Sequence, residues 1–78
     1  TKEQKKYLHK IAEEIDKKWD PEELQKALYD WSKELKIPSK DAFAAIYMVL
    51  IGKNHGPKAG WLVLSLDKAF IKKRFSSL

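Results

Sequence analysis

Apolar residues recur at helical spacing along the first half of the chain. In residues 7–19 they return every three or four positions, which gives one apolar stripe along a helix. A second stripe occupies residues 24–35. It follows Asp20 and Pro21, a pair that favours a helix start because aspartate caps the first turn and proline fits its first position. Pro38 disfavours helical backbone at Ile37, so the second helix should stop near Lys36.

A third, more apolar segment predicts the centre of the fold. Residues 42–51 contain no charged side chain, and a helix without a polar face is normally buried on several sides. Gly52 can end this helix in a left-handed conformation. A Gly-rich segment then leads to a short helix through Trp61, and Asp67 is expected to cap a final helix. The fold class is therefore predicted to be all-α, a small bundle of about five helices whose third helix is central and buried. The final helix is expected to turn three side chains inward: Phe70, Ile71 and Phe75.

Composition limits the chain to one small domain. Its 78 residues contain no cysteine, which excludes disulfides and cysteine-based zinc sites, and its 44% hydrophobic content is typical of a globular chain. The longest apolar run is too short to cross a bilayer, and the N-terminus is charged where a signal peptide needs an apolar run. We therefore expect a single helical domain over residues 1–78, monomeric, cytoplasmic and without a membrane partner.

The net charge of +5 lies entirely in the second half of the chain. Residues 1–36, the predicted amphipathic helix pair, carry nine lysines and nine acidic residues. Residues 37–78 carry six lysines and Arg74 against two acidic residues. An uneven basic balance is typical of domains that bind nucleic acid or another anionic partner. Lysines that only keep a surface soluble give the same balance, so charge alone leaves both interpretations open.

The sequence contains no catalytic or metal-binding motif. His9 and Glu13 are four residues apart on a predicted helix, but they supply only two of the ligands that a metal site needs. The acidic residues alternate with lysines, as on solvated helix faces. No phosphate-binding loop, dinucleotide motif or nucleophile elbow occurs. We expect no catalytic residue, no metal and no cofactor in this chain.

The turn Gly56-Pro57-Lys58-Ala59-Gly60 allows two interpretations. It can present backbone N–H groups and Lys58 to a phosphate at a helix start, or it can simply connect two helices tightly. The same ambiguity holds for Trp61, which follows the turn in a basic region. It is a candidate for stacking on an unpaired base, although packing against the third helix is the favoured interpretation. Trp19 and Trp31 continue apolar stripes and are predicted to be core residues.

The residues around this turn resemble a known family. The sequence Gly-Lys-Asn-His-Gly-Pro-Lys-Ala-Gly spans 52–60, after an aromatic and aliphatic run and before a final helix that contains Arg74-Phe75. This pattern resembles the C-terminal anticodon-binding region of class I aminoacyl-tRNA synthetases, above all that of the mainly archaeal class I lysyl-tRNA synthetase and more distantly that of glutamyl-tRNA synthetase. The good match covers residues 42–75, whereas residues 1–36 match only as a helix pair. Two departures are Asp67, where many relatives carry glycine, and Lys58, where arginine is usual.

The resemblance implies that the chain is the C-terminal fragment of a longer lysine-tRNA ligase, and Thr1 in place of methionine fits this. The parent would attach lysine to tRNA with ATP in an upstream catalytic domain. No His-Ile-Gly-His or Lys-Met-Ser-Lys-Ser sequence occurs here, so this fragment would be non-catalytic. Its partners would be the anticodon stem-loop of the lysine tRNA and the catalytic and other domains of the parent.

We predict that phosphate contacts to the tRNA come from the Gly-rich loop and the last helix. The predicted contact residues are Lys53, His55, Lys58, Lys72, Lys73 and Arg74. Phosphate contacts position an RNA, while its unstacked loop bases carry the sequence information. The alternative is a structural or protein-interaction bundle that packs on other domains of its parent, with lysines that only solubilise it. An RNA-binding face would gather these basic residues in one patch, whereas solubilising lysines would be scattered.

Overall fold

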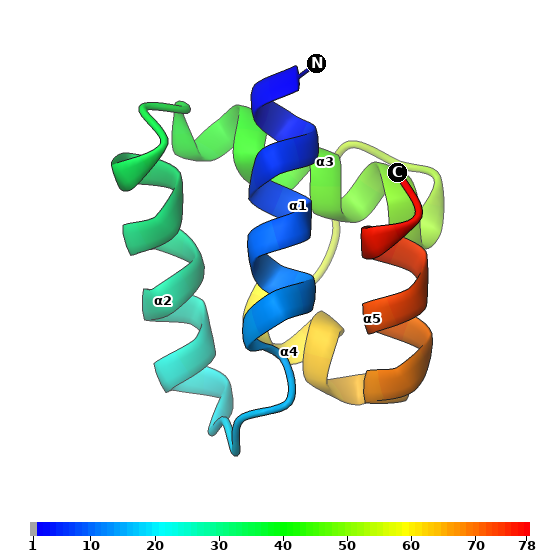
Figure 1. Cartoon of the computed structure of the whole chain (residues 1–78). Helices are drawn as coiled ribbons and strands as arrows, with labels where there is room; N and C mark the ends of the chain where they lie inside the picture. Colours follow the sequence, from blue (N-terminus) through cyan, green and yellow to red (C-terminus); the bar gives the residue numbers. More distant parts are fainter. Residues whose placement is uncertain (1) are drawn as a thin grey trace.

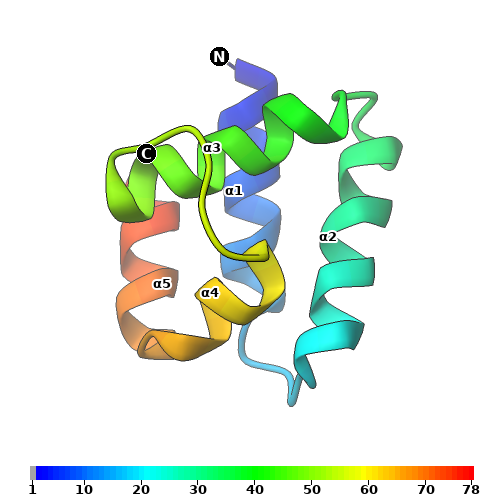
Figure 2. The ribbon, with the colours of Figure 1, turned by 180° about the vertical axis from the view of Figure 1, so that it is seen from behind.

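The computed structural model describes residues 2–78, in which all regular structure is helical; Thr1 lies outside the described residues. The elements are α1 (Lys2–Glu14), α2 (Pro21–Glu34), α3 (Ser39–Ile51), α4 (Ala59–Ser65) and α5 (Lys68–Ser76). Figure 1 shows α1 between α2 and α5, with α3 crossing behind them. Seen from behind in Figure 2, the loop after α3 runs down to α4. The predicted all-α bundle of five helices is confirmed. Among the described residues, no helix has both the length and the apolar character that crossing a membrane requires.

The starts of α2 and α5 differ in how they are capped. The Asp20 side chain accepts the backbone N–H of Glu22 at 3.0 Å, and the Glu23 carboxylate accepts the N–H of Asp20 at 3.4 Å. This reciprocal capping box satisfies N–H groups that the first turn leaves free. Asp67 precedes α5 as predicted, but its side chain makes no capping hydrogen bond. Only its backbone carbonyl takes part, accepting the N–H of Ile71 at 3.0 Å.

The hydrophobic core lies between α1 and the helices around it. The large apolar side chains that are fully buried are Tyr7, Ile11, Ile15, Leu24, Leu28, Ile46, Val63, Ile71 and Phe75. The Tyr7 hydroxyl donates to the carbonyl of Leu28 at 2.9 Å and so ties α1 to α2. Burial raises the pKa of Tyr7, because its charged form would lose its hydration in the core.

Two predictions about burial hold only in part. α3 packs against α1, α2 and α4, and its Ile46 is fully buried, but Met48 is 54% exposed. α3 therefore has a covered face and an open face, because the neighbouring helices do not surround it. Phe70 was expected to point inward and is instead 49% exposed. Ile71 and Phe75, four residues apart, define the buried face of α5, and Phe70 lies about 100° away from Ile71 around the helix.

Candidate functional site

The loop between α3 and α4 is fixed against the side chain of Tyr47. Gly52 begins the loop with a φ of 71°, a left-handed conformation that ends α3. The Tyr47 hydroxyl then donates to the carbonyl of Pro57 at 2.6 Å, and burial raises the pKa of Tyr47, which keeps this donor protonated. A Cβ atom at Gly56 would lie 2.9 Å from Cδ1 of Ile51 and 3.4 Å from the Tyr47 ring, so any larger residue would require the end of the Ile51 side chain to move. The loop is thus held in a defined path that leads to Lys58 at the start of α4.

The first turn of α4 lies directly on α2. The N–H of Gly60 donates to Oε1 of Gln25 at 2.7 Å. A Cβ atom at Gly60 would lie 2.7 Å from the carbonyl oxygen of Pro21 and 2.8 Å from the backbone N of Gln25. Because both of these neighbours are backbone atoms, they cannot turn away as a side chain would. Glycine is therefore required for this approach, and the motif's third glycine has a packing role.

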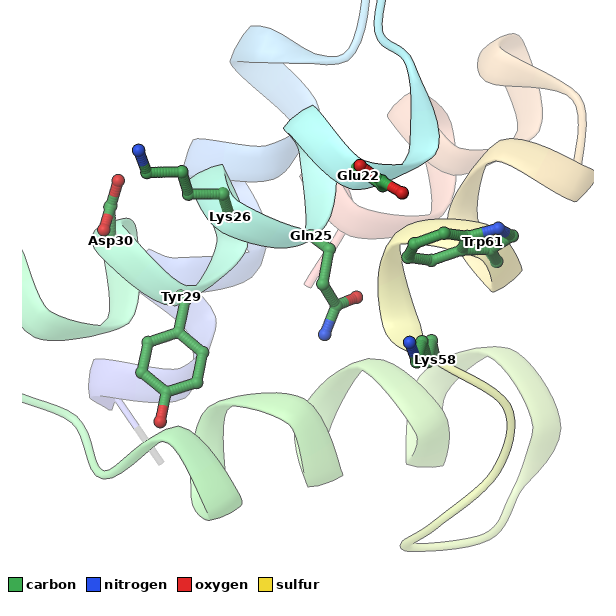
Figure 3. A pocket seen from close by; sticks show the side chains of 7 residues that line it. All are labelled: Glu22, Gln25, Lys26, Tyr29, Asp30, Lys58 and Trp61. Atoms are coloured by element: carbon green, nitrogen blue, oxygen red, sulfur yellow. The ribbon is translucent and has the colours of Figure 1, made fainter.

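An open cleft of about 510 Å³ lies beside this contact, between α2 and α4 (Figure 3). The lining side chains are Glu22, Gln25, Lys26, Tyr29, Asp30, Lys58 and Trp61. Two of them are aromatic and accessible: Tyr29 is 43% exposed and Trp61 38%. The ammonium of Lys58 lies 5.1 Å from the centroid of the Trp61 ring, within cation–π range. The cleft thus combines an aromatic surface and an amide, which can bind a base, with charges of both signs.

The predicted tRNA-contacting residues lie in two separate neighbourhoods. Lys58 lies with Trp61 beside α2, whereas Lys72 on α5 forms an ion pair with Asp16, at 2.6 Å, beside the end of α1. Figure 1 shows α2 and α5 on opposite sides of α1. The structure therefore brings Lys58 together with Trp61 but not with Lys72. The remaining predicted residues are exposed in the loop or on α5: Lys53, His55, Lys73 and Arg74.

The favoured prediction that Trp61 packs against α3 is wrong. Its ring lies at the cleft beside α2, because α4 buries Ala59 and Val63, and Trp61 falls on the opposite side of this short helix. Trp19 and Trp31, predicted to be core residues, are half-buried at the edge of the core. They pack edge to face with their ring centroids 5.8 Å apart.

Sequence reasoning missed the contribution of α2 to the cleft. Gln25 and Tyr29 lie in the segment that was interpreted only as half of an amphipathic pair. A usable pattern was present: Glu22, Gln25 and Tyr29 follow each other at intervals of three and four residues, so they share one face of the helix. Within residues 2–78, no three His, Asp or Glu side chains come together in a way that could hold a metal ion.

Comparisons with known proteins agree on one family. The family model described as "Anticodon binding domain" matches residues 1–78. The lysine–tRNA ligase of Archaeoglobus fulgidus is 38% identical over 77 residues, which is 99% of this chain and 16% of that protein. The lysine–tRNA ligase of Methanosphaera stadtmanae is 40% identical over 96% of this chain and 15% of its own length, and that of Picrophilus torridus is 36% identical over 96% and 15%. No solved structure gives a significant match.

Proposed function

This chain belongs to the family of anticodon binding domains, and from this premise we propose that it binds the anticodon stem-loop of the lysine tRNA as a non-catalytic part of a lysine–tRNA ligase. The matched relatives from archaea are lysine–tRNA ligases, and the chain spans about a sixth of their length, at most 16%. The attachment of lysine to tRNA and the use of ATP are assigned to the rest of such a parent. We further propose a cytoplasmic location and a monomeric domain.

The observation that carries this proposal is the family match over the whole chain. The basic excess lies after residue 36 and the predicted contact residues are exposed, which fits an RNA partner. Lys58 and Lys72 lie apart, however, and do not form the single patch that was expected of an RNA-binding face. In the proposed mechanism, exposed lysines of the α3–α4 loop and of α5 contact phosphates and position the RNA. Such contacts contribute affinity that falls with salt, because each neutralised phosphate releases counterions.

The test is a titration of the 78-residue chain with the lysine anticodon hairpin, followed by fluorescence anisotropy at several salt concentrations. Lys53→Ala and Arg74→Ala are expected to weaken binding, and each lost phosphate contact should reduce the slope of log K against log salt by about 0.7 for single-stranded RNA. Lys6→Ala is the matched control, because Lys6 is an exposed lysine on α1, in the half without net charge. Equal losses from Lys6→Ala would show that only total charge matters. No binding at low salt would refute the proposal.

A second function, packing against another domain of the same parent, is favoured by an apolar groove between α1 and α3. The groove has a volume of about 380 Å³ and is lined mainly by Leu8, Ala44, Ala45, Met48, Val49 and Leu78. The exposed Met48 makes it a surface suited to a protein contact. Met48→Ser separates the two functions. It should leave hairpin binding unchanged, and it should weaken association with the rest of the parent if that surface is a domain contact.

A further inference from the structure

We propose that the cleft between α2 and α4 receives one unstacked base of the RNA loop, with Trp61 as the stacking surface and Gln25 as a hydrogen-bond donor to the base. This inference rests on the RNA binding proposed above and names the part of the domain that touches a base. It assigns half of that contact to α2, in the half of the chain without net charge.

The contact between Gln25 and Gly60 fixes the orientation of the Gln25 amide. Its Oε1 atom accepts the Gly60 N–H at 2.7 Å, so its Nε2 group and two N–H donors are directed into the cleft (Figure 3). A donor in this position suits an acceptor on a base edge. Uracil, cytosine and guanine all present a carbonyl oxygen that can accept from this amide. The same glycine that lets α4 approach α2 thus also orients the polar group of the cleft.

Trp61 supplies the surface on which the base would stack. Its ring is 38% exposed, and one face already holds the ammonium of Lys58 at 5.1 Å from the ring centroid. A cation–π contact at an exposed site is weaker than the stacking of a base on an aromatic ring. The base would therefore replace the ammonium. Lys58 is an exposed side chain at the first turn of α4, and its ammonium would then be free to contact the phosphate of the bound nucleotide.

The far end of the cleft is held in place by aromatic packing. The ring of Tyr29 meets Phe43 of α3 edge to face, with the centroids 5.9 Å apart. The Tyr29 ring is therefore held by packing within the bundle, and the distance between α2 and α4 is set by the Gly60 contact. A cleft that is already formed loses less entropy on binding than one that must close around its ligand.

Charge distinguishes this cleft from the proposed phosphate contacts. Two carboxylates, Glu22 and Asp30, and two ammonium groups, Lys26 and Lys58, line it, so the cleft carries no net charge. Stacking and a hydrogen bond would dominate the binding of a base here. The contribution of Trp61 to affinity should therefore change little with salt, whereas contacts from lysines to phosphates should weaken steeply.

The experiment measures the affinity of the 78-residue chain for the lysine anticodon hairpin and for hairpins in which each loop nucleotide in turn is abasic. Trp61→Ala is expected to weaken binding of the intact hairpin by about tenfold or more, at low and at moderate salt alike. Phe70→Ala is the matched control, since Phe70 is an aromatic residue that is 49% exposed on α5, away from the cleft. Trp61→Phe keeps a ring and should keep most of the affinity, which guards against a folding defect in the alanine variant. At one loop position, removal of the base should weaken binding by the unaltered chain but not by Trp61→Ala, because the variant and the abasic site remove the same contact.

Gln25→Glu tests the donor separately, because it keeps an acceptor for Gly60 and replaces the two donors with a second acceptor. It should weaken binding of the intact hairpin but not of the hairpin that is abasic at the coupled position, whereas repulsion by the added negative charge would weaken both. Equal affinities of Trp61→Ala and Phe70→Ala for the intact hairpin would overturn the inference, and the proposed function would stand if Lys53→Ala still weakens binding. If the unaltered chain does not bind the hairpin at low salt, the inference and the proposed function are both overturned.

Discussion

The two main helix pairs of this domain are joined by different means. α1 and α5 contribute large, fully buried side chains to the core, among them Tyr7, Ile71 and Phe75. α2 and α4 instead meet through backbone, where Gly60 lies against the main chain of Gln25. Side chains between two helices fill the space around the contact. A contact through glycine leaves the space beside it open, and the cleft with Trp61 lies there. Both pairs contribute buried side chains to the core, among them Leu24 of α2 and Val63 of α4, but only the pair that meets through glycine has an open cleft beside its contact.

The largest effect is expected from shortening a side chain in the α1–α5 pair. Phe75→Ala removes a ring that is fully buried, and such changes cost about 3–5 kcal/mol of unfolding free energy. Small domains have only about 5–15 kcal/mol in total, so this variant should be largely unfolded on mild warming. Urea denaturation followed by circular dichroism measures the loss. Phe70→Ala on the same helix is the control and should cost far less, because that ring is 49% exposed. Similar losses would contradict the assignment of the buried face of α5.

The α2–α4 pair should respond to the addition of a single methyl group. Gly60→Ala places a Cβ atom 2.7 Å from the Pro21 carbonyl and 2.8 Å from the Gln25 backbone N. We expect a loss of about 1–3 kcal/mol, the usual cost of overpacking, reduced by the better helix propensity of alanine. α4 should also move away from α2, so Gly60→Ala should weaken hairpin binding even where the chain is folded. Ser65→Ala, at the exposed end of α4, is the control and should change neither quantity.

A smaller effect is expected from the hydrogen bond that holds the loop between α3 and α4. Tyr47→Phe removes the donor to the Pro57 carbonyl and should cost about 1 kcal/mol. Hydrogen exchange of the loop amides should speed up more than that of α1, because only the loop loses its attachment. Tyr29→Phe makes the same chemical change on a ring that is 43% exposed. If both variants lose equal stability, the Pro57 contact does not hold the loop.

The pattern of apolar residues predicted the helices well, because that pattern is local. Asp20 capped α2 and Gly52 ended α3 as the sequence indicated. Predictions that depended on which helices become neighbours were less successful. Phe70 and Trp61 were both expected to face the core, and both are exposed, since short helices bury only one narrow face. The cleft could not be predicted from the sequence alone, because it arises where Gly60 reaches Gln25 across 35 positions of chain.

The smallest effect on stability is expected at the α5 ion pair, and it sharpens the site prediction. Lys72 lies 2.6 Å from Asp16, but the two side chains are 54% and 62% exposed, so the pair should contribute about 0.2–1 kcal/mol and less in high salt. Lys72→Ala should therefore shift the urea midpoint slightly at low salt and by less at 1 M salt, where the Debye length falls to about 3 Å. Lys73→Ala, an exposed neighbour, is the control for stability.

For hairpin affinity, the order of the two variants should reverse. A lysine already paired with a carboxylate must leave that partner to reach a phosphate, so Lys73→Ala should weaken binding more than Lys72→Ala. Equal losses of affinity would show that Asp16 does not compete with the RNA for Lys72.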